Sequence, residues 1–153
     1  MGVAGCGKTA VGIALSAATG IPYRDGDELH PTANVAKMRR GEPLTDEDRW
    51  PWLARVGQAL TQAPMIIGCS ALKRRYRDLI TAEAGAPVTF IHLSGSRDLI
   101  AARMNARTGH FMPPSLLESQ FAALEPPAPD ENAFAVSIDQ SLESIVAAII
   151  IRW

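Results

Sequence analysis

Cysteine is scarce in this sequence, because only Cys6 and Cys69 occur among its 153 residues. The two are far apart and in no metal-ligand spacing, so neither a disulfide framework nor a cysteine metal site is indicated, and a reducing, cytoplasmic location is predicted. Long apolar runs are missing as well: none approaches the roughly 20 residues that span a bilayer. The N-terminus lacks the charged and apolar regions of a signal peptide.

Charge is also limited, at 20% of the residues with a formal net charge of −1. The basic residues are dispersed, so neither a nucleic-acid-binding face nor a membrane-binding stretch is indicated. Apolar residues make up 47% of the chain, which is enough for one core between a sheet and its covering helices. We therefore predict a single domain over residues 1–153.

Short apolar runs alternate with longer helical patterns along the chain. Strands are predicted over 21–25, 65–69, 88–93 and 134–138. Helices are predicted over 8–18, 31–40, 45–62, 71–84, 96–106, 115–124 and 142–151. Strands separated by helices predict a parallel sheet with helices on both faces, which is a three-layer α/β fold. Its binding crevice is expected at the carboxyl ends of the strands.

Residues 2–9 read GVAGCGKT and match the phosphate-binding pattern GxxxxGK[ST]. Glycines let the backbone wrap around a phosphate with its N–H groups inward, and the helix that follows adds a positive N-terminal dipole. Lys8 is predicted to reach the β- and γ-phosphates of ATP, and Thr9 to hold Mg²⁺. The other phosphate-binding residues predicted are Gly2, Val3, Ala4, Gly5, Cys6 and Gly7. The alternative, a chance glycine-rich turn, does not explain the helix that follows at once.

Only Met1 precedes this glycine loop, although such a loop normally follows a strand that is central in its sheet. Loss of that strand would leave unpaired edges on both neighbours. We predict that the first central strand is missing because the sequence starts at an internal methionine. A native chain with roughly 5–12 further residues, ending in an apolar strand, is expected. Gly68 is a second departure, since an apolar strand residue is expected at that position.

Two carboxylates, Asp25 and Asp27, stand at the end of the strand predicted over 21–25. That end faces the same crevice as the glycine loop. Carboxylates there can serve Mg²⁺ through water, the role predicted for Asp25, and accept a proton from an attacking hydroxyl, the role predicted for Asp27. An ordinary Asp-Gly turn is the alternative. His30 follows the pair and is a candidate substrate-binding residue, with a purely structural role equally open.

Arg103 and Arg107 lie four residues apart and so share one helix face, ahead of a lid predicted around 107–114. Arginines in front of a lid can stack on adenine or neutralise phosphate charge in the transition state. A solvated helix face is the alternative.

Six stretches of the chain, taken together, resemble the gluconokinase family. They are GVAGCGKT (2–9), DGDELHP (25–31), NVAKMRRGEPLTDEDRWPWL (34–53), CSALKRRYRDL (69–79), ARTGHF (106–111) and LESQFAALEPP (117–127). These stretches cover nearly the whole chain in order. The block DGD-x-x-HP followed by KM-x-x-G-x-PL is far more specific than the glycine loop alone.

The resemblance implies a P-loop kinase with a nucleoside-monophosphate-kinase-like fold, related to shikimate kinases, with a five-stranded parallel sheet and a lid. It implies transfer of the γ-phosphate of ATP to the 6-hydroxyl of D-gluconate, and a homodimer in many members. Asp27 matches the substrate-side carboxylate and would be the base. Arg49, by looser similarity to shikimate kinases, would pair with the gluconate carboxylate, and Lys73 would face the substrate. Arg103 would stack on adenine, and Arg107 would be the lid arginine.

Two rival functions stay open at this point. The first is a kinase of another small polyol acid such as shikimate, against which the KM-x-x-G-x-PL block argues. The second is a non-catalytic nucleotide-binding protein, which the missing first strand motivates.

Overall fold

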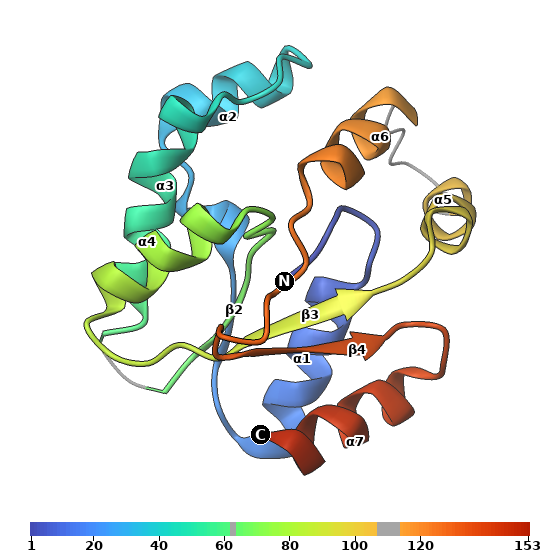
Figure 1. Cartoon of the computed structure of the whole chain (residues 1–153). Coiled ribbons are helices and arrows are strands. Elements are labelled where there is room, and N and C mark those ends of the chain that lie inside the picture. The colour runs from blue at the N-terminus through green and yellow to red at the C-terminus, as the bar shows by residue number, and fades with distance from the viewer. Residues whose placement is uncertain (62–63, 107–113) are drawn as a thin grey trace.

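The structure is a computed structural model, and it describes residues 1–61, 64–106 and 114–153. Its strands and helices alternate along the chain (Figure 1), which confirms the α/β prediction. The strands are β1 (Tyr23–Asp25), β2 (Ile66–Gly68), β3 (Phe90–Ser94) and β4 (Ala133–Ser137). The helices are α1 (Lys8–Thr19), the 3-10 helix η1 (Gly26–Leu29), α2 (Thr32–Arg39), α3 (Asp46–Ala59), α4 (Arg74–Ala84), α5 (Arg97–Asn105), α6 (Pro114–Ala123) and α7 (Leu142–Arg152).

Local sequence signals account for where several helices begin. The Thr45 hydroxyl accepts from the Asp48 amide at 3.3 Å, and the Asp48 carboxylate accepts from the Thr45 amide at 2.9 Å. This reciprocal capping box satisfies two N–H groups that would otherwise lack partners at the start of α3. The predicted start of α4 at Ala71 is wrong by three residues. Ala71 has a φ of 43°, a left-handed conformation that an α-helix cannot include, so α4 begins only after Lys73.

The strands form two parallel pairs. In one pair β1 lies beside β2, with Tyr23 opposite Ile66. In the other β3 lies beside β4, with Phe90 opposite Ala133. The five-stranded sheet that the family resemblance implied is thus represented by four strands in the described part of the chain. Parallel pairing requires the crossover helices that the sequence pattern predicted.

The backbone of Met1 and Gly2 connects the two strand pairs. The Met1 amino group donates to the carbonyl of Ile91 at 2.5 Å, and the Met1 carbonyl accepts from the amide of Leu93 at 3.0 Å. On the other side, the amide of Gly2 donates to the carbonyl of Ser70, just beyond β2, at 3.1 Å. An apolar groove of about 430 Å³ runs on from Met1 between β2 and β3.

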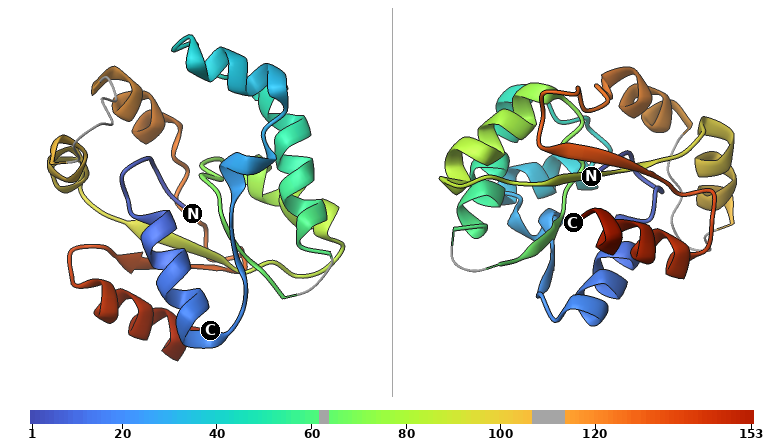
Figure 2. Two further views of the ribbon diagram at one scale, coloured as in Figure 1. Left: turned by 180° about the vertical axis from the view of Figure 1, so that it is seen from behind. Right: turned by 60° about the horizontal axis from the view of Figure 1, so that its bottom comes forward.

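Helices cover the strands from both sides (Figure 2). Helices α1 and α7 contact each other, with α1 against β1 and β2 and α7 against β4. Helices α3 and α4 form the other closely packed pair, away from α1 and α7. The chain therefore has the three layers that the sequence predicted.

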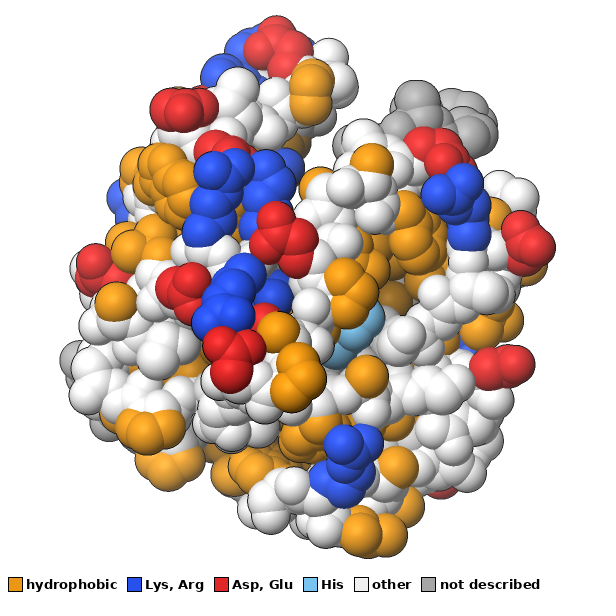
Figure 3. All heavy atoms as spheres, in the orientation of Figure 1, with side chains coloured by type: hydrophobic (Ala, Val, Ile, Leu, Met, Phe, Trp, Pro, Cys, Tyr) orange, Lys and Arg blue, Asp and Glu red, His pale blue; other side chains and the backbone are white. Residues whose placement is uncertain are grey.

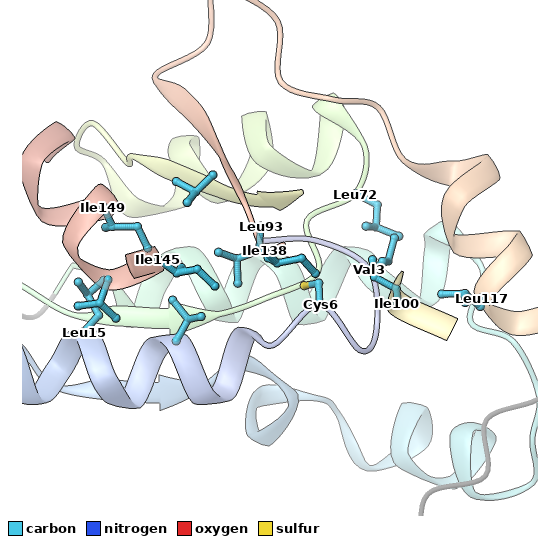
Figure 4. Packing of buried hydrophobic residues seen from close by; sticks show 13 residues of the cluster. Val3, Cys6, Leu15, Leu72, Leu93, Ile100, Leu117, Ile138, Ile145 and Ile149 are labelled. Carbon is cyan, nitrogen blue, oxygen red and sulfur yellow. The ribbon is translucent and has the colours of Figure 1, made fainter. Parts of the chain in front are cut away.

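The core consists of two clusters of buried residues. The larger lies where α1, α7 and the β3–β4 pair meet (Figure 4), and includes Leu15, Leu93, Ile138, Ile145 and Ile149. The smaller lies under α3 and α4 and includes Trp52, Leu53, Val56, Tyr76 and Ile80. Burying each aliphatic side chain of these two clusters contributes about 1.5–3 kcal/mol to the stability of the fold. These clusters fix the strand ends, from which the functional side chains project.

Gly68 departs from an apolar strand pattern for a steric reason. A Cβ atom at this position would lie 2.5 Å from the Tyr23 hydroxyl, which is closer than real Cβ contacts come. The glycine lets the tyrosine ring of β1 lie directly over β2. The Tyr23 hydroxyl lies 3.4 Å from Asp25 Oδ2, at the carboxyl end of the strands.

Candidate active site

The glycine loop leads directly into α1, as the motif predicted. Gly7 precedes the first helical residue with a φ of 96°, a conformation that favours glycine, and α1 begins at Lys8. The side chains of Val3 and Cys6 are buried in the larger core cluster. Both residues can therefore offer a phosphate only their backbone groups, and the prediction that they contribute in this way remains untested.

Lys8 folds back over its own loop. Its ammonium group donates to the carbonyls of Gly2 and Val3, at 3.0 Å each. These bonds hold the positive charge beside the loop, where phosphate oxygens would need it.

One hydrogen bond joins the glycine loop to the carboxylate segment. The Thr9 hydroxyl lies 3.2 Å from Asp25 Oδ2, although the two residues are 16 positions apart in the chain. The other Asp25 oxygen accepts from the amide of Asp27 at 3.0 Å, which caps η1. The structure thus brings together Thr9, Asp25 and Asp27, as expected for the carboxyl ends of neighbouring strands.

Asp27 has an exposed carboxylate with a raised pKa. Its side chain is 82% exposed, and no hydrogen bond joins its carboxylate to any residue in the described ranges. Partial desolvation by the surrounding protein raises its pKa, the negative charge of Asp25 raises it further, and Lys8 opposes both effects. A raised pKa makes a carboxylate a stronger proton acceptor.

His30 lies beside Asp27, with its Nε2 atom 3.9 Å from Asp27 Oδ1. Its ring stacks on the indole of Trp52, with centroids 4.1 Å apart and an interplanar angle of 14°. Burial lowers the pKa of His30 to about 4, and the positive charge of Arg49 lowers it in the same direction. His30 is therefore neutral near pH 7, and Arg49 is close enough to act on it.

Lys73 is not free. Its ammonium group is hydrogen-bonded to both carboxylate oxygens of Asp46, at 3.0 and 3.2 Å, and Arg75 and the Tyr76 hydroxyl donate to the same carboxylate. Arg75 also lies over the ring of Trp50. Basic and acidic side chains gather on the α3–α4 side of the molecule, and the surface is hollowed between α2 and α6 (Figure 3).

Arg103 lies on α5, which flanks the glycine loop. Its guanidinium donates to the carbonyl of Ile138, just beyond β4, at 2.6 Å. The next residue, Met104, is so close to Gly5 that a Cβ there would lie 2.6 Å from the methionine Cγ. Arg107 and the predicted lid up to 113 lie outside the described residues, and Pro114 already begins α6.

Three polar residues near this site were missed by sequence reasoning. Gln120 of α6 accepts a hydrogen bond from the amide of Ala4, within the glycine loop, at 2.6 Å. Asn34 is buried and contacts His30, and Asp46 gathers the cations around Lys73. Gln120 and Asn34 lie within stretches that resemble the gluconokinase family, but no local pattern indicated their contacts.

Oxygen ligands suited to Mg²⁺ are present at the loop. Thr9 Oγ1 and Asp25 Oδ2 lie 3.2 Å apart, and oxygen donors of this kind are the ligands that this hard cation prefers. In the described part of the chain, no three His, Cys, Asp or Glu side chains gather into a closed metal site.

A glycine loop on a helix N-terminus, beside carboxylates at the ends of parallel strands, defines a P-loop kinase. The shikimate kinase of Aquifex aeolicus vf5 has the same fold, with a TM-score of 0.63 at 16% identity over 99% of this chain and 92% of that one. No family model matches the chain.

Two much closer relatives specify the family. The thermoresistant gluconokinase of Escherichia coli K12 is 44% identical over 156 residues, which is 98% of this chain and 89% of the relative. The crystal structure of a gluconokinase from Sinorhizobium meliloti 1021 superposes with a TM-score of 0.91 at 47% identity, covering 99% of this chain and 89% of that one. The chain belongs to the gluconokinase family, and is thus an ATP-dependent carbohydrate kinase.

Proposed function

We propose that this protein transfers the γ-phosphate of ATP to the 6-hydroxyl of D-gluconate, giving 6-phospho-D-gluconate and ADP. The observation that carries the proposal is the 3.2 Å contact between Thr9 and Asp25. It brings the phosphate-binding loop and the carboxylate segment to one place, so that a phosphoryl donor and a hydroxyl acceptor can meet there.

The transfer needs a base and positive charge on opposite sides of the moving phosphoryl group. Asp27, with its raised pKa and open carboxylate, accepts the proton of the attacking hydroxyl. Lys8 and the N–H groups of the loop offset the negative charge of the phosphates. Arg107 would add charge from the lid, a role predicted from sequence alone.

Thr9, and Asp25 through water, would hold Mg²⁺, which bridges phosphate oxygens and offsets their charge when it is bound. Arg103 would lie against adenine. The contact between Thr9 and Asp25, and the position of Arg103 on α5 beside the loop, support these assignments.

On the substrate side, Arg49 is proposed to bind the carboxylate of gluconate, and His30 a hydroxyl. Arg49 follows Asp48, whose carbonyl accepts from Asn34, and Asn34 contacts His30. Lys73 is already paired with Asp46, so a direct contact with substrate would require it to exchange that partner.

An ADP-release assay tests the proposal, with ATP and Mg²⁺ against gluconate, shikimate, glucose and AMP. Turnover is expected with gluconate alone. The two rivals are separated by the same assay: turnover with shikimate supports the first, and ATP binding without turnover on any acceptor supports the second.

Lys8→Ala is the sharpest variant for this assay. It should lose most of the activity, on the order of 100-fold or more, because a transition-state cation is removed. The unfolding midpoint should stay near that of the parent chain. Arg40→Ala removes an exposed cation that pairs only with Glu42 among the described residues, and serves as the matched control. Retained turnover in Lys8→Ala would contradict the assignment.

We also propose that the groove between β2 and β3 accepts a fifth, central parallel strand that runs into Met1. Its apolar lining, including Ile67, Phe90 and Ile91, suits a strand buried on both faces. The bonds of Met1 to Ile91 and Leu93 already follow the pattern of a strand ladder.

A chain extended before Met1 by five alternating Val and Ile residues tests this groove. The extension should raise the unfolding midpoint and the turnover number. A matched extension with proline at the second and fourth positions lacks the N–H donors of those two residues, which disrupts the ladder, and should raise neither. Equal effects of both extensions would reject the groove as a strand site.

A homodimer and a cytoplasmic location stay predictions. Among the described residues, no helix has the length and apolar character to cross a membrane.

A further inference from the structure

Asn34 has an unusual place for a polar side chain. It lies in the first turn of α2, is only 4% exposed, and its amide reaches two groups at once. Nδ2 lies 2.7 Å from the carbonyl oxygen of Asp48 and 3.3 Å from Nδ1 of His30.

These two contacts determine which ring nitrogen of His30 carries the proton. A backbone carbonyl can only accept, so the Asn34 atom facing Asp48 must be the amide nitrogen. Its second hydrogen then points to Nδ1 of His30, which must accept with its lone pair. In a neutral imidazole the proton consequently resides on Nε2, the atom that faces Asp27.

The surroundings of His30 hold the ring in this orientation. Trp52 stacks on its face, and the indole N–H of Trp52 donates to the carbonyl of Gly26 at 2.7 Å, next to Asp27. Asp48, which receives the Asn34 amide, is itself fixed by Lys37 at 2.8 Å and by the capping box with Thr45.

The charged groups facing His30 come from two elements. Asp27 lies on η1, and Arg49 lies on α3 next to Asp48, whose carboxylate is occupied by Lys37. Burial and Arg49 both disfavour the imidazolium. A cationic ring would draw the pKa of the Asp27 carboxylate down and weaken it as a base, whereas a neutral N–H donor leaves its basicity intact.

We propose that Asn34 is a positioning residue that holds His30 as the neutral Nε2–H tautomer, so that His30 donates a hydrogen bond to a hydroxyl of the sugar acid bound at Asp27. The gap of 3.9 Å between Nε2 and Asp27 Oδ1 is too long for a hydrogen bond but can be spanned by one hydroxyl oxygen. That oxygen accepts from His30 and donates to Asp27. This role for the substrate rests on the proposed function, but the tautomer does not.

The tautomer is measured first, by long-range ¹H–¹⁵N NMR of the protein without ligands. His30→Gln identifies the His30 signals by removing them. The expected result is a protonated Nε2 and a lone pair on Nδ1, with no titration between pH 8 and pH 5.5. A proton on Nδ1 would overturn the proposal.

Asn34→Ala then tests whether Asn34 is responsible. In this variant both tautomers should be populated, and the His30 signals should titrate at higher pH than in the parent chain. Asn132→Ala, which removes an exposed amide bonded to Val88 and Thr89, is the matched control and should leave the signals in place. Unchanged His30 signals in folded Asn34→Ala would show that Asn34 does not position the ring.

Kinetics test the role toward substrate. The amide nitrogen of glutamine can reach the position of Nε2, whereas that of asparagine comes closer to the position of Nδ1. His30→Gln should therefore keep a KM for gluconate about tenfold lower than His30→Asn, with KM for ATP unchanged in both. Equal KM values would overturn the substrate contact. If the parent chain turned over no sugar acid, the proposed function would fail while the NMR result still stood.

Discussion

Asp27 and Asp46 are two carboxylates at the starts of helical segments, and they are used in opposite ways. Asp46 accepts from Lys73, Arg75 and Tyr76, and its side chain is 22% exposed. Asp27 is 82% exposed, and the ring of His30 stands 3.9 Å away without bonding to it. A carboxylate that already accepts several hydrogen bonds holds elements together. One that accepts none and has a raised pKa can take a proton.

The raised pKa of Asp27 also affects the pH dependence of folding stability. The folded pKa of Asp27 is raised, so between its unfolded and folded pKa values the folded state binds more protons. Stability from this group therefore falls as pH rises through that window, and the ionised Asp27 disfavours the fold at neutral pH. Asp46, in contrast, accepts hydrogen bonds from two cations and a hydroxyl, which link α3 to the start of α4.

Asp27→Asn should have the largest effect. It should lower kcat roughly 100- to 1,000-fold because the proton acceptor is lost, while ATP affinity changes little. The unfolding midpoint should stay the same or rise, because a disfavoured charge is removed. Steady-state kinetics and thermal unfolding check both parts, and an equal loss in turnover and ATP affinity would assign Asp27 to metal binding or structure instead.

Asp46→Asn should show the converse pattern. It should destabilise the fold by about 2–3 kcal/mol, since two cations and a hydroxyl lose a charged acceptor, and change kcat less than tenfold. Urea unfolding gives the free energy. Asp78→Asn, which removes a 64% exposed carboxylate 4.0 Å from Arg74, is the control and should cost less than about 0.5 kcal/mol. A loss of turnover as large as in Asp27→Asn would break the comparison and place Asp46 in the substrate site.

The smallest effect on stability is expected from lowering the pH. The pKa of His30 is lowered to about 4 from 6.5, so the unfolded state binds the extra proton first as pH falls. Stability is present above pH 6.5 and declines toward pH 4, by about 1–2 kcal/mol between pH 7 and pH 5. The comparison of parent and His30→Gln unfolding free energies at these two pH values isolates this contribution. A parallel decline in both would assign the acid sensitivity to other groups.

The helices were predictable because their determinants are local. The Thr45 capping box and the Ser96 and Ser141 caps are visible as sequence patterns, and each is formed. The start of α4 was not predictable, since nothing in the sequence marks Ala71 as left-handed. The reason for Gly68 likewise depends on the ring of Tyr23, which packs across from another strand.

The candidate site likewise contains residues that could be predicted from the sequence and residues that could not. The meeting of Thr9 and Asp25 follows from the rule that parallel strands present their carboxyl ends together, so a motif and a strand end were enough. Asn34, Asp46 and Gln120 depend on contacts between separate elements. Their residue types are common on helices, and only the fold distinguishes a buried amide that bonds a histidine from an ordinary solvated one.

Gln120 of α6 occupies one of the backbone N–H groups of the glycine loop. The side-chain oxygen of Gln120 accepts a hydrogen bond from the Ala4 amide at 2.6 Å, and this amide is among the groups predicted to bind phosphate. A phosphate oxygen bound at Ala4 would compete with the Gln120 side-chain oxygen for the same N–H group. The prediction that Ala4 binds phosphate therefore implies that its hydrogen bond to Gln120 breaks when nucleotide binds.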